Sequence, residues 1–278
     1  MKPRVMSLVI FTCAVGLLTS NSNTNITDAM IGITLVALGA GAAGCLNMWY
    51  EADLDALMTR TCLRPIPTGK INKQQALIFG IFLTVFSVGA LNYFANILSA
   101  ALLLFTILFY LFVYTIWLKR ITPQNIVIGG VAGSLPPVIG WAIATNSISL
   151  ASISLFLIIF LWTPSHFWAL SLYKADDYKK AKIPMLPLTD GIEKTKIYIF
   201  IYSLLMLPVI ILPYVINFSG LIYLIPAIML TIYYNFICYD LYKHKKNKFV
   251  LKKAKKVFGY SILYLFLIFV LFLIDNLI

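Results

Sequence analysis

The chain has 278 residues, of which 61% are hydrophobic and only 12% are charged, and its formal net charge is +12. A soluble domain carries about twice that charged fraction. The composition therefore excludes an ordinary water-soluble globular protein, and lipid must solvate most of the apolar surface. The positive charge is typical of basic residues kept on the cytoplasmic side of a membrane beside anionic lipid, and we expect no nucleic-acid partner.

Apolar runs long enough to cross a bilayer recur along the chain and predict nine transmembrane helices. They lie near residues 5–19, 29–47, 75–94, 96–117, 125–144, 150–172, 197–215, 218–239 and 257–275. The first run is short and opens abruptly, so we expect that part of an N-terminal segment is missing, and it shows no cleavage site of a signal peptide. The four cysteines are scattered without metal-ligand spacing and are expected to be packing residues.

The Lys and Arg residues fix the expected topology. All 22 fall within residues 2–4, 60–73, 119–120, 174–196 and 243–256. The intervening connections contain none, which is the alternation that the positive-inside rule requires. We therefore predict an all-α bundle with a cytoplasmic N-terminus and an external C-terminus. Residues 1–278 form one intramembrane domain, with its chemically loaded loops near 48–74 and 173–196 on the cytoplasmic side.

The first cluster of chemical interest follows the second apolar run. It consists of Asn47, Glu51, Asp53 and Asp55. If the helix continues through this cluster, every member except Asp53 lies on one face within about 80°. Three oxygen-bearing side chains at this spacing suit Mg²⁺, which is usually shared with a phosphate. The alternative is an acidic, solvated helix end that balances Arg60 and Arg64, and for an isolated cluster we favour that alternative.

The second cluster ends the sixth apolar run. Helical phase places His166, Tyr173 and Asp177 within about 40° of one another, with Asp176 adjacent. A histidine near a membrane span is costly enough to suggest a function. A packing histidine that is hydrogen-bonded to a neighbouring helix explains it equally well.

Taken together, the clusters suggest a reaction. Two acidic helix ends on one membrane face, each beside Arg or Lys, could hold Mg²⁺ between carboxylates and a diphosphate. An apolar cavity among the helices would take the hydrocarbon of that substrate. The combination fits transfer of an allylic prenyl group with metal-assisted loss of diphosphate. Pro-rich segments at 64–69 and 183–187 follow the two clusters and suggest an internal duplication of a four-helix unit plus one extra helix.

Several segments carry a family resemblance that spans nearly the whole chain. They are residues 2–5, 47–55, 58–61, 64–65, 163–168, 177–178 and 183–187. Together they resemble the UbiA-type intramembrane prenyltransferase superfamily. The His-Phe-Trp sequence at 166–168 and the Ile-Pro-Met-Leu-Pro sequence at 183–187 are similar to its heme-modifying branch, the protoheme IX farnesyltransferases.

The resemblance implies a nine-helix fold in the bacterial inner membrane with an active site on the cytoplasmic side. It implies Mg²⁺-dependent transfer of farnesyl from farnesyl diphosphate to a vinyl group of heme b, followed by capture of the resulting cation by water to give heme O. Such a product supplies terminal oxidases. A heme A synthase or a terminal oxidase assembly is accordingly an expected partner, besides membrane lipid.

The resemblance also implies roles for individual residues. The first metal–diphosphate motif corresponds to Asn47, Glu51 and Asp55, with Asp53 as an additional acid. Asp177 falls in the second motif beside Asp176, so the expected metal ligands are Glu51, Asp55 and Asp177. Contacts to diphosphate or to heme propionates are expected from Arg60, Arg64, Lys2 and Arg4. His166 is expected to contact heme, either as an iron ligand or through a propionate.

The motifs depart from the superfamily pattern at two positions. Glu51 stands where Asp is usual, which lengthens the arm but keeps the carboxylate. Tyr173 occupies the earlier acidic position of the second motif, which weakens the expectation of two fully protein-held Mg²⁺ ions.

Three other functions remain open from the sequence. The same fold could prenylate an aromatic ring, as in quinone synthesis. A heme-binding or assembly protein without catalysis is a second alternative. A secondary transporter is the third, but transporters tend to place ionisable groups near the bilayer midplane, whereas these acids cluster at helix ends on one face.

Overall fold

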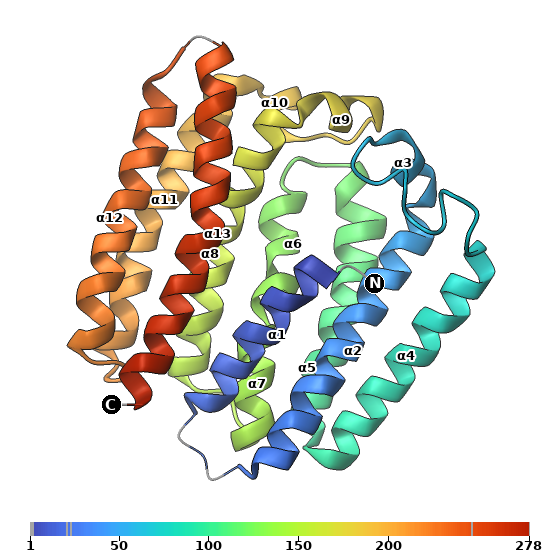
Figure 1. Ribbon diagram of the computed structural model, residues 1–278, viewed down its shortest axis with the longest axis vertical. Helices are drawn as coiled ribbons and strands as arrows, with labels where there is room; N and C mark the ends of the chain where they lie inside the picture. Colours follow the sequence, from blue (N-terminus) through green and yellow to red (C-terminus); the bar gives the residue numbers. More distant parts are fainter. Residues whose placement is uncertain (1–2, 21, 23, 246, 278) are drawn as a thin grey trace.

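The structure, a computed structural model, describes residues 3–20, 22, 24–245 and 247–277. Every regular element in this part of the chain is a helix (Figure 1). The long helices and the segments between them, in chain order, are α1 (Pro3–Leu18), α2 (Ile26–Tyr50), α3 (Ala52–Leu57), α4 (Lys73–Phe94), α5 (Ile97–Leu108), the π-helix η1 (Phe109–Trp117), the 3₁₀ turn η2 (Leu118–Arg120), α6 (Asn125–Ser134), α7 (Pro136–Thr145), α8 (Leu150–Tyr173), α9 (Ala175–Lys180), α10 (Leu186–Thr189), α11 (Gly191–Val215), α12 (Leu221–Lys243) and α13 (Asn247–Leu277).

Each of the nine predicted apolar runs coincides with a helical segment, so the all-helical membrane fold is confirmed. Eight segments of the described chain are long and apolar enough to span a bilayer. The apolar part of α1, Met6–Leu18, is shorter than these. The total of nine spans and the orientation of the two ends stay predictions.

Polar residues at the turns explain where several helices begin. The Asn72 side chain accepts a hydrogen bond from Gln75 N at 2.7 Å, and the Gln75 side chain reaches back to the Asn72 backbone. Ser149 and Ser152 form the same reciprocal box at the start of α8. Such boxes satisfy two of the amide groups that a helix start leaves without a partner.

Two predicted single helices are composite. The run at 96–117 consists of α5 followed by the π-helix η1, and the run at 125–144 divides into α6 and α7 at Leu135. The second break has a local cause, because Pro136 has no amide hydrogen to donate to the preceding turn, although Leu135 itself keeps helical backbone angles. The π-helix has no such signature in the sequence.

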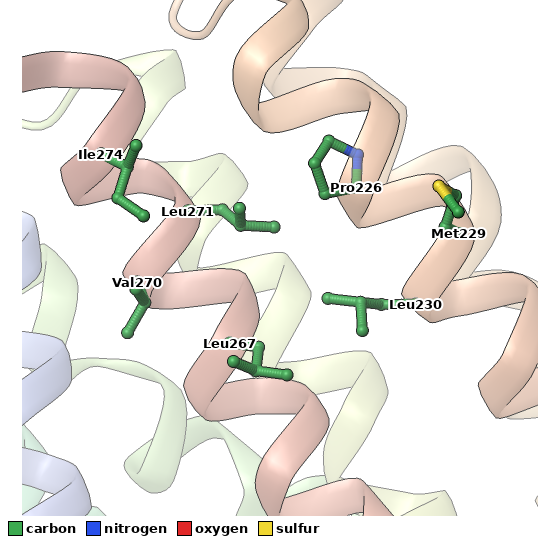
Figure 2. A pocket seen from close by; sticks show the side chains of 7 residues that line it. All are labelled: Pro226, Met229, Leu230, Leu267, Val270, Leu271 and Ile274. Carbon is green, nitrogen blue, oxygen red and sulfur yellow. The ribbon is translucent and has the colours of Figure 1, made fainter. Parts of the chain in front are cut away.

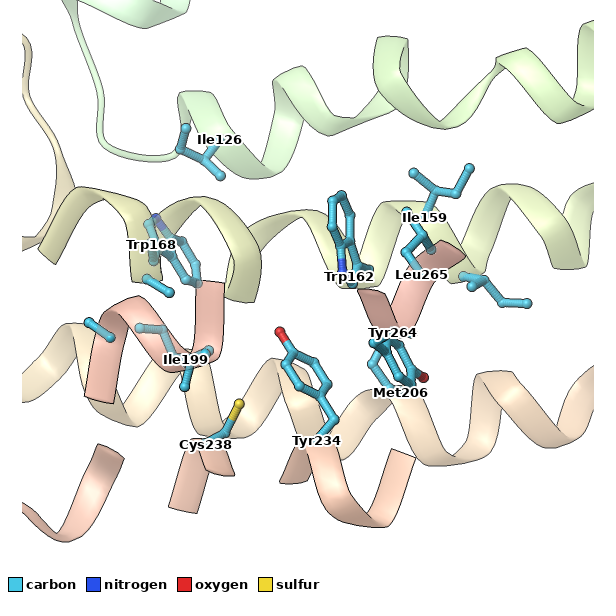
Figure 3. Packing of buried hydrophobic residues seen from close by; sticks show 14 of the residues in the cluster. Ile126, Ile159, Trp162, Trp168, Ile199, Met206, Tyr234, Cys238, Tyr264 and Leu265 are labelled. Carbon is cyan, nitrogen blue, oxygen red and sulfur yellow. The ribbon is translucent and has the colours of Figure 1, made fainter. Parts of the chain in front are cut away.

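The buried apolar residues form two clusters that divide the bundle. One cluster is centred on α8, α11, α12 and α13, and Figure 3 shows Trp162 and Trp168 of α8 facing Tyr234 of α12 within it. The other cluster joins α1, α2, α4, α5 and α7. The predicted duplication of a four-helix unit stays a prediction, because α7 packs in the cluster of the first helices and Val15 of α1 belongs to the other cluster.

The two ends of α12 are held by charged side chains from neighbouring helices. Asp275 of α13 accepts hydrogen bonds from Gly220 N at 2.6 Å and Tyr223 N at 3.1 Å. At the other end, the fully buried Lys196 of α11 donates to the carbonyl oxygen of His244 at 2.7 Å. The carboxylate lies at the positive end of the helix dipole and the ammonium at the negative end, so both contacts are favourable.

Helices α1 and α7 cross with their backbones in close contact. A Cβ atom on Gly140 would lie 1.9 Å from Cys13 O, and one on Gly16 would lie 2.1 Å from Pro137 O. Small residues permit this approach, which lets helices in lipid gain van der Waals contact.

We therefore expect Gly140→Ala to separate α1 from α7 and to lower the stability of the bundle by about 1–3 kcal/mol, because the added methyl overpacks the contact. Thermal unfolding of the detergent-purified protein measures the loss. Gly133→Ala is the matched control, since a Cβ there meets nothing within 4 Å. Equal midpoints for the two variants would contradict the close crossing.

Candidate active site

The two predicted acidic regions meet at one end of the bundle. Helix α3, which carries Asp53 and Asp55, lies there with α9, which carries Asp176 and Asp177 (Figure 1). Thr59, in the loop after α3, donates a hydrogen bond to Asp177 Oδ1 at 2.6 Å. The structure thus brings together segments that are more than a hundred residues apart in the sequence.

The helix through the first cluster is not continuous, so that part of the prediction is wrong. Helix α2 ends at Tyr50, and α3 starts at Ala52 after a non-helical Glu51 (φ −92°, ψ 15°). Two backbone hydrogen bonds nevertheless bridge the break, from Glu51 N to Asn47 O and from Asp55 N to Glu51 O. The i, i+4 register therefore survives the change in backbone.

The side chains of this cluster divide as the spacing predicts. Asn47, Glu51 and Asp55 are 0%, 3% and 3% exposed. The Asp53 side chain is 53% exposed on the other side. Burial of two carboxylates contradicts a merely solvated helix end, because unpaired buried charge is costly.

Each carboxylate of the cluster has its own basic partner. Lys119 Nζ forms an ion pair and hydrogen bond with Glu51 Oε1. One guanidinium nitrogen of Arg64 lies 2.8 Å and 2.7 Å from the two Asp55 carboxylate oxygens. The exposed Asp53 pairs with Arg120 at 3.1 Å. The structure therefore places a basic side chain beside each of the two buried carboxylates.

Asn47 is attached to the π-helix. Its Nδ2 donates to Thr115 Oγ1 at 3.0 Å, and the Thr115 hydroxyl donates to Tyr110 O at 2.8 Å. Lys119 follows Thr115 by four residues, as Glu51 follows Asn47. The acidic cluster and the segment Phe109–Arg120 therefore pair along their lengths.

The donor chemistry of this site fits a hard divalent cation. Carboxylate and amide oxygens are the ligands that Mg²⁺ takes, and Glu51, Asp55 and Asp177 supply them from buried positions. Within the described residues, no three His, Cys, Asp or Glu side chains are grouped closely enough to hold a metal. A metal bound at Glu51 or Asp55 would share that carboxylate with the ammonium or guanidinium that now pairs with it, or would displace that cation.

His166 is clamped inside the bundle rather than placed on a stripe with Asp177. Its ring stacks on Trp162 at 4.2 Å and on Phe258 at 4.6 Å between centroids, and its Nδ1 lies 2.7 Å from Ser261 Oγ. Tyr173 packs edge-on against the same Phe258. Helix α8 ends at Tyr173, so Asp177 on α9 leaves the predicted stripe.

The remaining predicted residues lie at the rim. Asp176 is exposed beside the buried Asp177, and Arg60 is exposed near Tyr178. Burial raises the pKa of Tyr178, and the Arg60 guanidinium lowers it in part. Lys2 lies outside the described residues, and only the backbone of Arg4 is described, in α1.

Sequence reasoning gave no site role to four residues that the structure places there. The Lys119–Arg120 pair was used only as a topology signal, Thr59 entered only within the segment 58–61 of the resemblance, and Thr115 was not singled out. The spacing of Thr115 and Lys119 matches that of Asn47 and Glu51, and this match was a usable signal once the two helices were known to be neighbours.

An apolar groove elsewhere in the bundle offers no chemistry for a diphosphate. It lies between α12 and α13 (Figure 2), encloses about 370 Å³ and exposes no polar lining. Its lining residues are Pro226, Met229, Leu230, Leu267, Val270, Leu271 and Ile274. The charged end of the bundle is therefore the candidate active site.

Comparison with known proteins gives consistent matches. The model of the UbiA prenyltransferase family matches residues 8–263. A Pelagibacter ubique (strain HTCC1062) protein named Protoheme IX farnesyltransferase is 76% identical over 276 residues, which cover 99% of this chain and 91% of that protein. A Mesorhizobium japonicum protein named Protoheme IX farnesyltransferase 2 is 51% identical and covers 99% of this chain and 88% of its own length.

Solved structures share the fold. A structure of digeranylgeranylglyceryl phosphate synthase superposes with a TM-score of 0.82 at 19% identity, covering 99% of this chain and 94% of that one. A UbiA homologue from Archaeoglobus fulgidus bound to DMAPP and Mg²⁺ superposes with a TM-score of 0.66 at 17% identity, covering 96% and 97%. At these identities the likeness establishes the fold alone.

Proposed function

This chain belongs to the UbiA prenyltransferase family, and we propose that it is a protoheme IX farnesyltransferase. The reaction transfers the farnesyl group of farnesyl diphosphate to a vinyl group of heme b and adds water, giving heme O and diphosphate. The observation that carries the proposal is 76% identity over 99% of the chain to a protein of that name. The whole chain then acts as one intramembrane prenyltransferase domain.

The buried acids and the basic side chains beside them account for the departure of diphosphate from farnesyl diphosphate. Asn47, Glu51, Asp55 and Asp177 supply oxygen ligands at one end of the bundle. Mg²⁺, when bound there, supplies positive charge to the departing diphosphate. Lys119 and Arg64 already stand beside these carboxylates and neutralise further negative charge on the leaving group. Exposed Arg60 offers a further cation for diphosphate or for a heme propionate.

The farnesyl cation formed by this departure must meet the heme vinyl group before water does. Apolar and aromatic side chains of the bundle exclude water and stabilise a cation. The electrons of the vinyl double bond form the new carbon–carbon bond to farnesyl and leave a carbocation on the adjacent vinyl carbon. One water molecule adds to that carbon and loses a proton to solvent, which leaves a hydroxyl group on the product.

The distribution of charge supports a location for the reaction. The chain is an integral membrane protein. We assign it to the bacterial inner membrane with the acidic clusters on the cytoplasmic side, because every Lys and Arg falls in alternate connections. We propose a heme A synthase or a terminal oxidase assembly as the recipient of heme O.

His166 tests the heme side of the proposal. We expect His166→Ala to weaken heme b binding at least tenfold, because the ring is the clamped imidazole within the bundle that can meet heme iron or a propionate. Titration followed in the Soret band measures the affinity. His244→Ala, at the end of α12, is the control. Unchanged heme affinity and turnover in His166→Ala would leave it a packing residue.

The reaction itself is tested by mass spectrometry of the pigment. Purified protein is incubated with heme b and farnesyl diphosphate, with Mg²⁺ or with EDTA. We expect a mass increase equal to a farnesyl group plus a hydroxyl group, and only in the presence of Mg²⁺. Unmodified heme, with diphosphate released when a hydroxybenzoate is supplied instead, would move the function to aromatic prenylation. Unmodified heme without any diphosphate release would indicate a protein that binds heme but does not catalyse.

A further inference from the structure

The π-helix η1 lies where the fifth helical segment reaches the acidic cluster. π-Helices are rare, occur mostly as single turns inside α-helices and frequently mark functional sites. Within η1, the Thr115 hydroxyl donates to Tyr110 O, five residues earlier, at 2.8 Å. A threonine in an ordinary helix bonds instead four residues back, as Thr106 does to Leu102 O at 2.7 Å. Thr106 thus follows α-helical backbone, whereas Thr115 follows the wider turn of the π-helix.

The hydroxyl proton of Thr115 determines how Asn47 is oriented. A hydroxyl has one proton, and the Tyr110 carbonyl oxygen can only accept it. The contact of 3.0 Å between Thr115 Oγ1 and Asn47 is therefore a bond in which the amide nitrogen donates. The NH₂ group of Asn47 faces Thr115, and its amide oxygen faces the opposite way.

The amide orientation matters for a hard cation. Mg²⁺ binds carbonyl and carboxylate oxygen, whereas an amide NH₂ group is a hydrogen-bond donor and repels it. Rotation of the Asn47 amide by about 180° would exchange its oxygen and NH₂ ends, and the hydrogen bond to Thr115 favours one of these two orientations. Asn47 is fully buried one turn before Glu51, so an exchanged amide would place the NH₂ group beside the buried carboxylates.

We propose that Thr115 is a positioning residue, which acts through Asn47. The π-helix orients the Thr115 hydroxyl, which accepts a hydrogen bond from the Asn47 NH₂ group. This contact leaves the amide oxygen of Asn47 turned toward the metal–diphosphate site as a ligand. Lys119 lies four residues after Thr115 and pairs with Glu51, which lies four residues after Asn47. This inference rests on the metal-assisted step of the proposed function but does not depend on the prenyl acceptor.

The test measures metal binding directly. Purified Thr115→Val, which keeps the shape but loses the hydroxyl, is titrated with Mn²⁺ in place of Mg²⁺, and bound Mn²⁺ is followed by electron paramagnetic resonance. Loss of a side chain that orients a metal ligand typically costs about 10–100-fold in metal affinity, and we expect a loss in that range. The KM for farnesyl diphosphate should rise in parallel.

Two further variants separate orientation from packing. Thr115→Ser keeps a hydroxyl and should restore Mn²⁺ affinity to near the wild-type value. Thr106→Val removes the corresponding hydroxyl from the same helical segment and should bind Mn²⁺ as the wild type does. Wild-type affinity in Thr115→Val, or an equal loss in Thr106→Val, would overturn the proposal.

The outcomes also separate this inference from the proposed function. Mn²⁺ binding that depends on Thr115 while no heme product forms would sustain the positioning role and overturn the heme reaction. If heme O forms and Mn²⁺ affinity is unchanged in Thr115→Val, the heme reaction is sustained and the positioning role is overturned. Wild-type protein that binds no Mn²⁺ would overturn the positioning role.

Discussion

Asp55→Ala should abolish formation of heme O and leave the protein inserted in the membrane. Asp55 is 3% exposed at the charged end of the bundle and holds Arg64 through both carboxylate oxygens. The substitution removes a proposed metal ligand and the carboxylate that pairs with Arg64. Removing one group that stabilises transition-state charge costs about 10²–10³-fold in turnover, and we expect at least that loss.

Product is measured by mass spectrometry, and insertion by the amount of protein recovered in washed membranes. Asp190→Ala is the control, because among the described residues the Asp190 carboxylate pairs with the neighbouring Lys194 and Thr189, at the start of α11. We expect that variant to retain turnover. Wild-type turnover in Asp55→Ala would remove Asp55 from the metal–diphosphate motif.

Lys119→Met should lower the stability of the metal-free protein more than loss of Arg120, whose ion pair at the cluster is exposed. The substitution leaves the Glu51 carboxylate, 3% exposed, without its cation. Breaking a buried pair from one side costs about 3–5 kcal/mol. The Lys119 side chain is partly exposed, so we expect a loss of about 3 kcal/mol and a fall in the unfolding midpoint of roughly 6 °C or more.

Magnesium should restore much of this loss, because a divalent cation can supply the charge that Lys119 supplied. The unfolding midpoint in detergent, followed by circular dichroism with EDTA and then with Mg²⁺, measures both effects. Arg120→Met is the control, since the exposed pair of Arg120 and Asp53 contributes less than about 1 kcal/mol. Equal midpoints for Lys119→Met and the wild type in EDTA would contradict the pairing.

The sequence predicts the helical fold well because the bilayer imposes a simple rule on it. Each span must be long and apolar, and loop charge must alternate, so both features are visible in the order of residues alone. The inward face of the first acidic cluster is also predictable. Asn47, Glu51 and Asp55 keep a four-residue spacing that survives even the break in the backbone at Glu51.

The partners of these acids are less accessible to sequence reasoning. Tyr50, Glu51 and Ala52 contain no helix breaker, so the break between α2 and α3 reflects tertiary contacts rather than local preference. Lys119 lies 68 residues from Glu51, and only the packing of η1 beside α2 makes them neighbours. A π-helix leaves no periodic signal that would identify Thr115 beforehand.

The way in which α12 is held at both ends has a consequence for biogenesis. Its first amide groups depend on Asp275, which is the last acidic residue of the chain and is synthesised only after α12 itself. In hydrocarbon, amide groups without a partner are costly. Helices α12 and α13 should therefore enter the bilayer as a hairpin, and a ribosome stalled before residue 275 should leave α12 incompletely integrated and open to membrane proteases.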